Sequence, residues 1–409
     1  MTTMTVNSDR LWTALQEMGR IGATENHGNR RLALSAEDRE ARALFCDWAR
    51  AAGCEVTIDR IGNIFSRRPG SDPAALPVVI GSHLDTVPTG GRFDGALGVL
   101  AGLEVLRRLQ DEHIETRAPV EVVAWTNEEG ARFSPMTMGS SVFVGDITPD
   151  FALSQRDPDG ITVAEALEQI DQVGAVPVKA REFAAYLELH IEQAPLLKEA
   201  NNDIGIITGS YNAKYFVATI IGEAAHVGPT FMEQRHDAMV AAAALTLEID
   251  RIGRAQGRDG RANAPYIELY PNVRGVIPSQ VQLSCDVRHA DPAKTVEMEA
   301  ELRAACEKVA DERDVEITLE QYFEFGPIDC DPKMQALIRD TASELGLKPR
   351  DMLTVAGHDA VPMMGHCPTA LFFVPSETGI SHNAREYSTP EQCANGAAVL
   401  LNALLKLAC

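Results

Sequence analysis

Hydrophobic positions along the chain follow two alternating patterns, which predict strands and helices in turn. The apolar run at 77–80 and the mainly apolar segment at 120–125 have the length and composition of buried strands. The segments 8–20 and 96–110 instead repeat their apolar residues every three or four positions, as one face of a helix does. This order of strand, loop and helix is typical of an α/β sheet, in which ligands gather at the carboxyl ends of the strands.

The same patterns predict that a second domain interrupts this α/β domain. A βαββαβ order, typical of a two-layer α+β (ferredoxin-like) domain, is predicted from strands near 214–221, 265–270, 280–287 and 315–320 and helices near 237–252 and 293–311. Another apolar strand, 369–374, and a final helix, 390–407, come after it. We therefore predict a discontinuous α/β domain, 1–210 plus 328–409, with an inserted domain at 211–327.

Composition narrows the class of protein. A chain of 409 residues is too long for one ordinary core, which favours two domains. The 37 basic and 59 acidic residues give a net charge of −22, which argues against nucleic acid or an anionic membrane as a partner. Eight scattered cysteines without a CxxC pair, no apolar run near 18 residues and no signal-peptide pattern predict a cytoplasmic protein with reduced thiols.

The first candidate metal-binding residues follow directly after the strand at 77–80. His83 and Asp85 form an H-x-D motif, and Asp94 follows in a glycine-rich loop. Imidazole and carboxylate are ligands of zinc, manganese and cobalt at neutral pH. We expect Asp85 to accept a hydrogen bond from the His83 ring nitrogen that faces away from the metal. An H-x-D motif at a strand end is also common in a simple capped turn.

Further ligand types follow other predicted strands. Glu128 and Glu129 come after the strand at 120–125, and His190 ends the strand at 185–189. Adjacent side chains on extended backbone point in different directions, so one glutamate can bind metal while the other transfers protons. A pair of acids in a loop is more often solvated surface. Because these residues share one end of the sheet with His83, we favour a functional site.

A series of motifs in matching order then carries a family resemblance. The chain resembles the branch of the dinuclear-metal aminoacylase and carboxypeptidase superfamily that contains N-carbamoyl-L-amino acid hydrolases, β-ureidopropionase and allantoate amidohydrolase. The motifs are GSHLDTVPTGGRFDGALGVLAGL (81–103), TNEEGARF (126–133), ELHIEQAP (188–195), GEAAHVGPT (222–230), DVRH (286–289), AGHDA (356–360) and VPSETGISH (374–382). Peptidase members typically have an acidic ligand at the position of His190.

The resemblance implies roles for individual residues. It implies two divalent ions (zinc, manganese or cobalt) bridged by Asp94, one also held by His83 and His190, the other by Glu129 and His382. It implies that Glu128 is the general base, and the catalytic set is Glu128, His226 and Asp85. Gln193, Arg288 and His226 would bind the small-molecule substrate. The inserted domain would act as a lid and form a homodimer, in which His226 reaches the partner's active site.

These roles imply a metal-dependent amidohydrolase that cleaves the ureido C–N bond of an N-carbamoyl amino acid or related ureido acid. Two cations about 3.5–4 Å apart can generate hydroxide and polarise the carbonyl. Glu128 would take the proton from water and pass it to the leaving nitrogen. A hydrogen bond from His226 to the developing oxyanion would contribute about 3 kcal/mol. The planar fork of Arg288 suits a carboxylate, although a surface ion pair is the alternative.

Two positions depart from the pattern of this branch. Gly275 stands where the branch usually has an asparagine that helps hold the substrate carboxylate, and Ala194 replaces a glycine. Both changes affect the expected identity of the substrate more than the expected hydrolytic reaction. An amidase acting on another N-acyl amino acid therefore stays open as an alternative, as does a catalytically silent binding protein.

Overall fold

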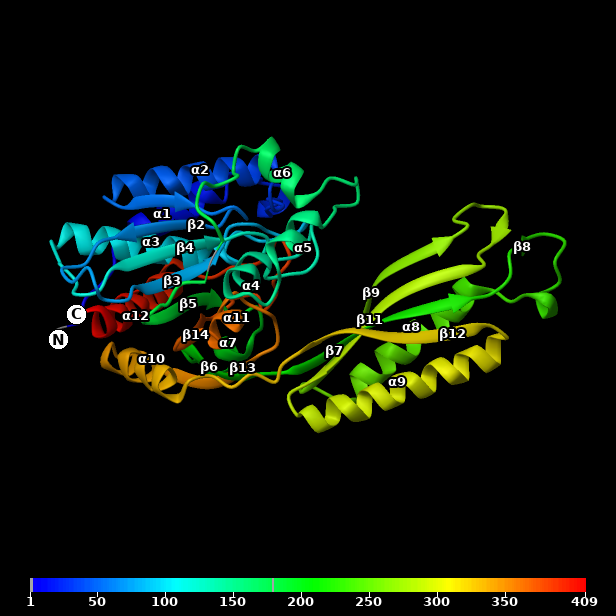
Figure 1. The fold of residues 1–409 in the computed structure, drawn as a ribbon. Coiled ribbons are helices and arrows are strands. Elements are labelled where there is room, and N and C mark those ends of the chain that lie inside the picture. Colours follow the sequence, from blue (N-terminus) through cyan, green and yellow to red (C-terminus); the bar gives the residue numbers. More distant parts are fainter. Residues whose placement is uncertain (1–2, 179) are drawn as a thin grey trace. The chain divides into compact units, whose positions relative to one another are not determined.

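The computed structural model describes residues 3–178 and 180–409 and divides into two compact units (Figure 1). The larger unit consists of Met1–Thr208, Asp329–Met352 and Ala356–Cys409. The smaller unit consists of Gly209–Ile328 and Leu353–Val355. Within the described residues, no helix is both long enough and apolar enough to cross a membrane.

An eight-stranded sheet forms the centre of the larger unit. Its order is β1-β2-β4-β3-β5-β14-β6-β13. The strands are β1 (Glu55–Ile58), β2 (Ile64–Arg68), β3 (Val78–His83), β4 (Val120–Trp125), β5 (Ala185–Ile191), β6 (Ile204–Ser210), β13 (Pro349–Thr354) and β14 (Thr369–Val374). The four central strands β4, β3, β5 and β14 run parallel, so their carboxyl ends meet at one edge of the sheet.

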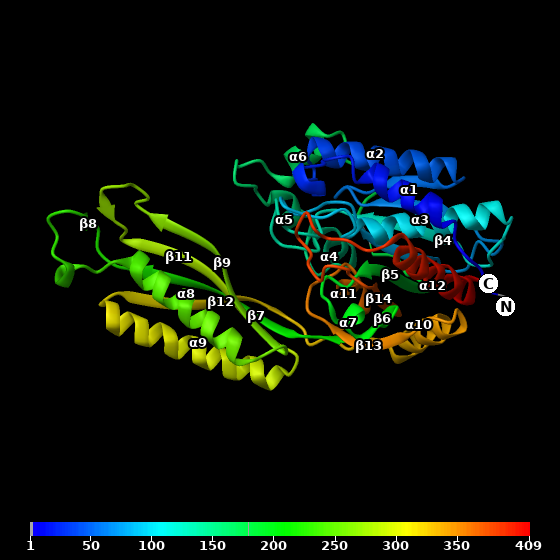
Figure 2. The ribbon, with the colours of Figure 1, turned by 180° about the vertical axis from the view of Figure 1, so that it is seen from behind.

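Helices flank this sheet. They are α1 (Ser8–Met18), α2 (Ala36–Ala51), α3 (Ala96–Asp111), α4 (Met138–Val144), α5 (Pro149–Ser154), α6 (Val163–Gln169), α7 (Leu196–Ala200), α10 (Pro332–Glu344), α11 (Ala360–Met364) and α12 (Pro390–Ala408), with a 3₁₀ turn at Glu25–His27. Helix α3 packs on β3 and β5, and α1 and α12 pack on α3 (Figure 2). Because α3 is buried along nearly its whole length, it fixes the loop that precedes it.

The smaller unit has the βαββαβ order that its hydrophobic pattern predicts. Its main elements are β7 (Asn212–Ile221), α8 (Ala238–Ala255), β9 (Gly260–Tyr270), β11 (Gln280–His289), α9 (Pro292–Arg313) and β12 (Glu316–Phe325). The antiparallel sheet has the order β12-β7-β11-β9. Alternate residues of β7, among them Phe216, Ala218 and Ile220, are buried in the core formed with α8 and α9. The short strands β8 (Ala225–His226) and β10 (Val276–Ile277) pair with each other, and a 3₁₀ turn covers Met232–Gln234.

The structure corrects one predicted boundary in the larger unit. Strand β5 does not end before His190 but continues through it to Ile191. The reason is the neighbouring strand, because β14 pairs Phe373 with His190 and Val374 with Ile191. His190 is therefore held by the sheet itself and not by a loop.

Candidate metal centre and active site

Polar side chains from separate segments meet at the carboxyl edge of the central strands. His83 is the last residue of β3, Glu128 and Glu129 follow β4, and His190 lies near the end of β5. His382 lies in the segment between β14 and α12, and Asp94 in the loop before α3. The parallel pairing of the strands explains why segments so distant in sequence supply one site.

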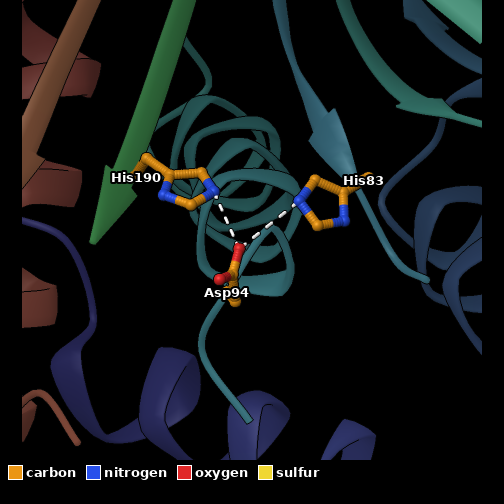
Figure 3. A group of neighbouring side chains, drawn as sticks. All are labelled: His83, Asp94 and His190. Atoms are coloured by element: carbon orange, nitrogen blue, oxygen red, sulfur yellow. Dashed lines mark ion pairs between the residues drawn. The ribbon is translucent and has the colours of Figure 1, made fainter. Parts of the chain in front are cut away.

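The first group of candidate metal ligands is His83, Asp94 and His190, all buried. The Oδ1 atom of Asp94 lies 3.1 Å from Nε2 of His190 and 3.5 Å from Nε2 of His83 (Figure 3). The loop can approach the ring of His83 only because residue 95 is glycine. Gly95 has φ +65°, and a Cβ atom there would lie 2.4 Å from that ring.

The second group is Asp94, Glu129 and His382. Nε2 of His382 lies 3.2 Å from Oε2 of Glu129 and 3.6 Å from Oδ2 of Asp94. The side chain of His382 is 51% exposed, whereas the carboxylates of Glu129 and Asp94 are buried. Asp94 thus belongs to both groups and presents a different oxygen to each.

Charge interactions dominate the electrostatics of the two groups. Burial lowers the pKa of His83, but Glu128, Asp94 and Asp85 outweigh it and raise that pKa well above its usual value. Burial raises the pKa of Asp94, but His190 and His83 outweigh it and hold that pKa well below its usual value. A hydrogen bond to Glu129 raises the pKa of His382 to about 9. The carboxylates of this site therefore stabilise positive charge.

The donor atoms fit divalent cations. Imidazole nitrogens and carboxylate oxygens are the ligand types that bind zinc, manganese and cobalt. In addition, Oε1 of Glu129 is buried and has no hydrogen-bond partner among the described residues. A buried carboxylate oxygen without a partner is costly, and a cation would satisfy it.

Asp85 makes different contacts from those predicted. Its carboxylate does not accept from the ring of His83, because Nδ1 of His83 lies 3.8 Å from Oδ1 of Asp85 but 2.9 Å from the Asp85 backbone carbonyl oxygen. The carboxylate instead accepts the backbone N–H groups of Glu128 and Glu129, each at 3.2 Å. Asp85 therefore fixes the ring of His83 through its backbone and the two glutamates through its side chain.

Gln193 and Ser381 also contact the shared ligand. Nε2 of Gln193 donates to Oδ2 of Asp94 at 2.8 Å, and the backbone N–H of Gln193 donates to the Ser376 hydroxyl. The Ser381 hydroxyl lies 2.7 Å from the same Asp94 oxygen. The sequence motifs singled out Gln193 but gave Ser381 no role.

Glu386 is a buried residue that the sequence analysis missed. Its Oε1 atom accepts the N–H groups of Phe93 and Asp94 at 2.9 and 3.1 Å, and Oε2 accepts from the Ser381 hydroxyl at 2.6 Å. Burial and the nearby Asp94 raise the pKa of Glu386 to about 7. It therefore positions the loop that carries Asp94, and the only sequence signal was an acid four residues after His382.

The remaining predicted residues, His226 and Arg288, belong to the smaller unit, whereas both ligand groups belong to the larger one. His226 is exposed in β8, and its Nδ1 atom accepts the N–H of Gly228 at 3.0 Å. Arg288 is half-buried in β11, and its Nε donates to Oδ1 of Asp286 at 2.8 Å. Their predicted contacts with substrate stay predictions.

A cavity of about 280 Å³ adjoins the two ligand groups. Asp94, Glu129, His190 and His382 line it, together with Glu128 and Gln193. His358 lines it as well, with its ring centroid 4.5 Å from that of His190. The cavity thus gives a small molecule access to the candidate ligands and to Glu128.

Comparison with known proteins gives full-length matches. The sequence profile of the peptidase family M20/M25/M40 matches residues 79–406. The N-carbamoyl-L-amino-acid amidohydrolase of Rhizobium meliloti is 40% identical over 403 residues, 98% of this chain and 97% of the relative. The allantoate amidohydrolase of Bacillus subtilis is 30% identical over 396 residues, 96% of each chain. Among solved structures, an amidase of the hydantoinase/carbamoylase family from Burkholderia vietnamiensis has a TM-score of 0.95 and 44% identity, covering 100% of this chain and 99% of its own.

Proposed function

Because the chain belongs to the peptidase family M20/M25/M40 and is a metal-dependent hydrolase of C–N bonds, we propose that it cleaves the ureido C–N bond of an N-carbamoyl amino acid or related ureido acid. The observation that carries this proposal is the pair of ligand groups that share Asp94, with Glu128 beside them. The 40% identity to an N-carbamoyl-L-amino-acid amidohydrolase over nearly the whole chain supports the choice of substrate class.

We propose that these residues hold two divalent ions. Asp94 would bridge them, His83 and His190 would complete one set of ligands, and Glu129 and His382 the other. When bound, a pair of zinc, manganese or cobalt ions would activate a water molecule and polarise the substrate carbonyl. The separate directions of the two Asp94 oxygens support the bridging role.

Glu128 is the proposed general base. Its Oε2 atom lies 3.4 Å from Nε2 of His83, and Asp85 anchors its backbone. Burial raises the pKa of Glu128 well above its usual value, although the neighbouring His83 acts in the opposite direction. A carboxylate in this position can accept a proton from water and return it to the leaving nitrogen.

The substrate's own carboxylate and carbonyl need separate partners. We propose that Arg288 binds the carboxylate through its planar fork and that His226 donates to the carbonyl oxygen as charge develops on it. Gln193, which already contacts Asp94, would orient the substrate beside the ions.

One observation favours a second candidate function, an amidase acting on another N-acyl amino acid. Among the described residues, nothing apart from the chain neighbours lies within 4 Å of a Cβ atom built at Gly275, so no described side chain packs against the point where the missing asparagine would begin. The carboxylate would then have one donor fewer than in the branch that the sequence resembles. Such a site suits an acyl substrate that is held less strongly by its carboxylate.

A substrate panel separates these functions. Metal-stripped protein is supplied with manganese, cobalt or zinc and tested on N-carbamoyl, N-formyl and N-acetyl amino acids. We expect turnover of the carbamoyl compounds with release of ammonia. Hydrolysis of the acyl compounds alone, without ammonia, would establish the second function, and metal binding without any turnover would contradict both.

We also propose a homodimer formed through the smaller unit. Helix α8 exposes Met239, Val240 and Leu247 to solvent, with Leu247 72% exposed. Val240 and Leu247 share one face of the helix, since they are seven residues or two turns apart, and Met239 is the neighbour of Val240 in sequence. Large apolar side chains exposed along one helix commonly mark a surface that another chain covers. The family resemblance adds that His226 serves the active site of the neighbouring chain.

Mixing two inactive variants tests this shared site. His226→Ala and Glu128→Gln chains should each be nearly inactive, and mixing them should recover about a quarter of the wild-type activity, since half of the dimers are mixed and each has one intact site. Activity is measured after subunit exchange has been verified with a mass tag on one variant. A monomer by light scattering, or no recovery after proven exchange, would exclude the sharing of His226.

A further inference from the structure

One side of the cavity next to the metal ligands is apolar. Met136, Ala356 and Gly357 form this side, whereas the other lining side chains carry carboxylate, imidazole, amide or hydroxyl groups. Of the described residues that line the cavity, none is lysine or arginine. The apolar side has no place in the chemistry proposed above, so it is available to recognise another part of the substrate.

The backbone of Met136 is fixed relative to Glu128. The N–H of Thr137 donates to the carbonyl of Glu128 at 2.6 Å, and Nδ2 of Asn127 donates to the carbonyls of Phe133 and Pro135 at 2.7 and 3.2 Å. These bonds tie the loop that carries Met136 to the segment that carries the proposed base. The backbone at position 136 is therefore held close to the segment that carries the proposed base.

The Met136 side chain reaches across to Gly357. A Cβ atom at Gly357 would lie 2.5 Å from Cε of Met136, so the terminal methyl group occupies the space that any other residue at 357 would need. Gly357 precedes His358, which lies against His190. Together, Met136 and Gly357 form a continuous apolar part of the cavity lining.

We propose that Met136 and Gly357 bind the substrate's side chain, and that the substrate is an N-carbamoyl α-amino acid with an aliphatic, thioether or aromatic side chain. This inference rests on the proposed function. Packing an apolar side chain here removes apolar surface of both partners from water. Methionine has three flexible torsions and a polarisable sulfur, so it adapts to several side-chain shapes. An acidic side chain, or a second polar ureido group, would face Met136, Ala356 and Gly357, whose side chains offer it no charge and no hydrogen bond.

Ratios of kcat/KM between substrates test the proposal, because a purely structural defect lowers kcat/KM for all substrates by a similar factor. We measure kcat/KM for N-carbamoyl-alanine, N-carbamoyl-methionine and N-carbamoyl-phenylalanine with metal-loaded protein. Met136→Ala should raise the phenylalanine-to-alanine ratio by about 10-fold or more, since it enlarges the pocket by several heavy atoms. Met136→Leu keeps the volume and should leave the ratio within about 3-fold of the wild type.

Two further variants complete the design. Gly357→Ala pushes the Met136 methyl group into the cavity and should lower the same ratio, opposite to Met136→Ala. Met352→Ala is the matched control, because Met352 is also half-buried and lies over a glycine, with its Sδ atom 2.4 Å from a Cβ built on Gly205. Met352 does not line the cavity, so its removal should leave the ratio unchanged.

The outcomes distinguish a failure of the proposed function from a failure of side-chain recognition by Met136 and Gly357. Wild-type protein that hydrolyses no N-carbamoyl amino acid would overturn the proposed function, and this inference with it. Turnover in the wild type with an unchanged ratio in both folded, metal-loaded Met136→Ala and Gly357→Ala would overturn only the inference. A wild-type preference for N-carbamoyl-aspartate over N-carbamoyl-methionine would do the same.

Discussion

Replacing Glu128 with glutamine should lower kcat by about 10²- to 10⁴-fold while the metal content stays near that of the wild type. Glutamine keeps the size of the side chain but removes the proton acceptor. The backbone N–H of residue 128 still donates to Asp85, so the position of the loop is unchanged. Steady-state kinetics on the best substrate of the panel and metal analysis of the same sample measure the two quantities.

The adjacent Glu129 provides a matched control with the opposite expectation. Its carboxylate lies 3.2 Å from Nε2 of His382, and Asp85 holds its backbone in the same way. Glu129→Gln should therefore lose metal, and activity should return in part when the metal concentration is raised. If Glu128→Gln loses metal and Glu129→Gln retains it, the two roles are exchanged; full turnover by Glu128→Gln would place the base elsewhere.

The parts of the fold that depend on short-range patterns could be predicted from the sequence. The strands 120–125 and 369–374 have the predicted bounds because each is mainly apolar and buried along its whole length in the centre of the sheet. The family resemblance is confirmed by the full-length relatives. Strand β13, with the sequence PRDMLT, was missed because it lies at the edge of the sheet and has no apolar pattern.

The contacts between distant segments could not be predicted in the same way. Glu386 binds the N–H of Phe93 across 293 residues of sequence, and nothing in its own neighbourhood distinguishes it from a surface acid. The carboxylate of Asp85 was expected to bind the His83 ring, but it binds the backbone after β4. The parallel pairing of β3 with β4 brings this backbone into reach. Residue types thus indicated the candidate metal ligands, but not the groups that hold those side chains in place.

Asp94→Ala should remove both metal ions, whereas His382→Ala should chiefly weaken one. Asp94 presents Oδ1 to His83 and His190 and Oδ2 to His382, so its loss deprives both ligand groups of a shared anion. His382 belongs to one group only and is half-exposed. Bound metal is measured by elemental analysis after dialysis against a metal buffer at several free concentrations.

The folding of both variants is measured as a control, because an unfolded variant would also lose its metal. Far-UV circular dichroism and thermal unfolding of the metal-free variants should show that both are folded, since the helix that follows Asp94 is buried independently of its carboxylate. The binding curve of His382→Ala should then show one tight and one weakened ion, and that of Asp94→Ala neither. Two tightly bound equivalents in Asp94→Ala would exclude a bridging role, because the remaining ligands would then form two independent sites.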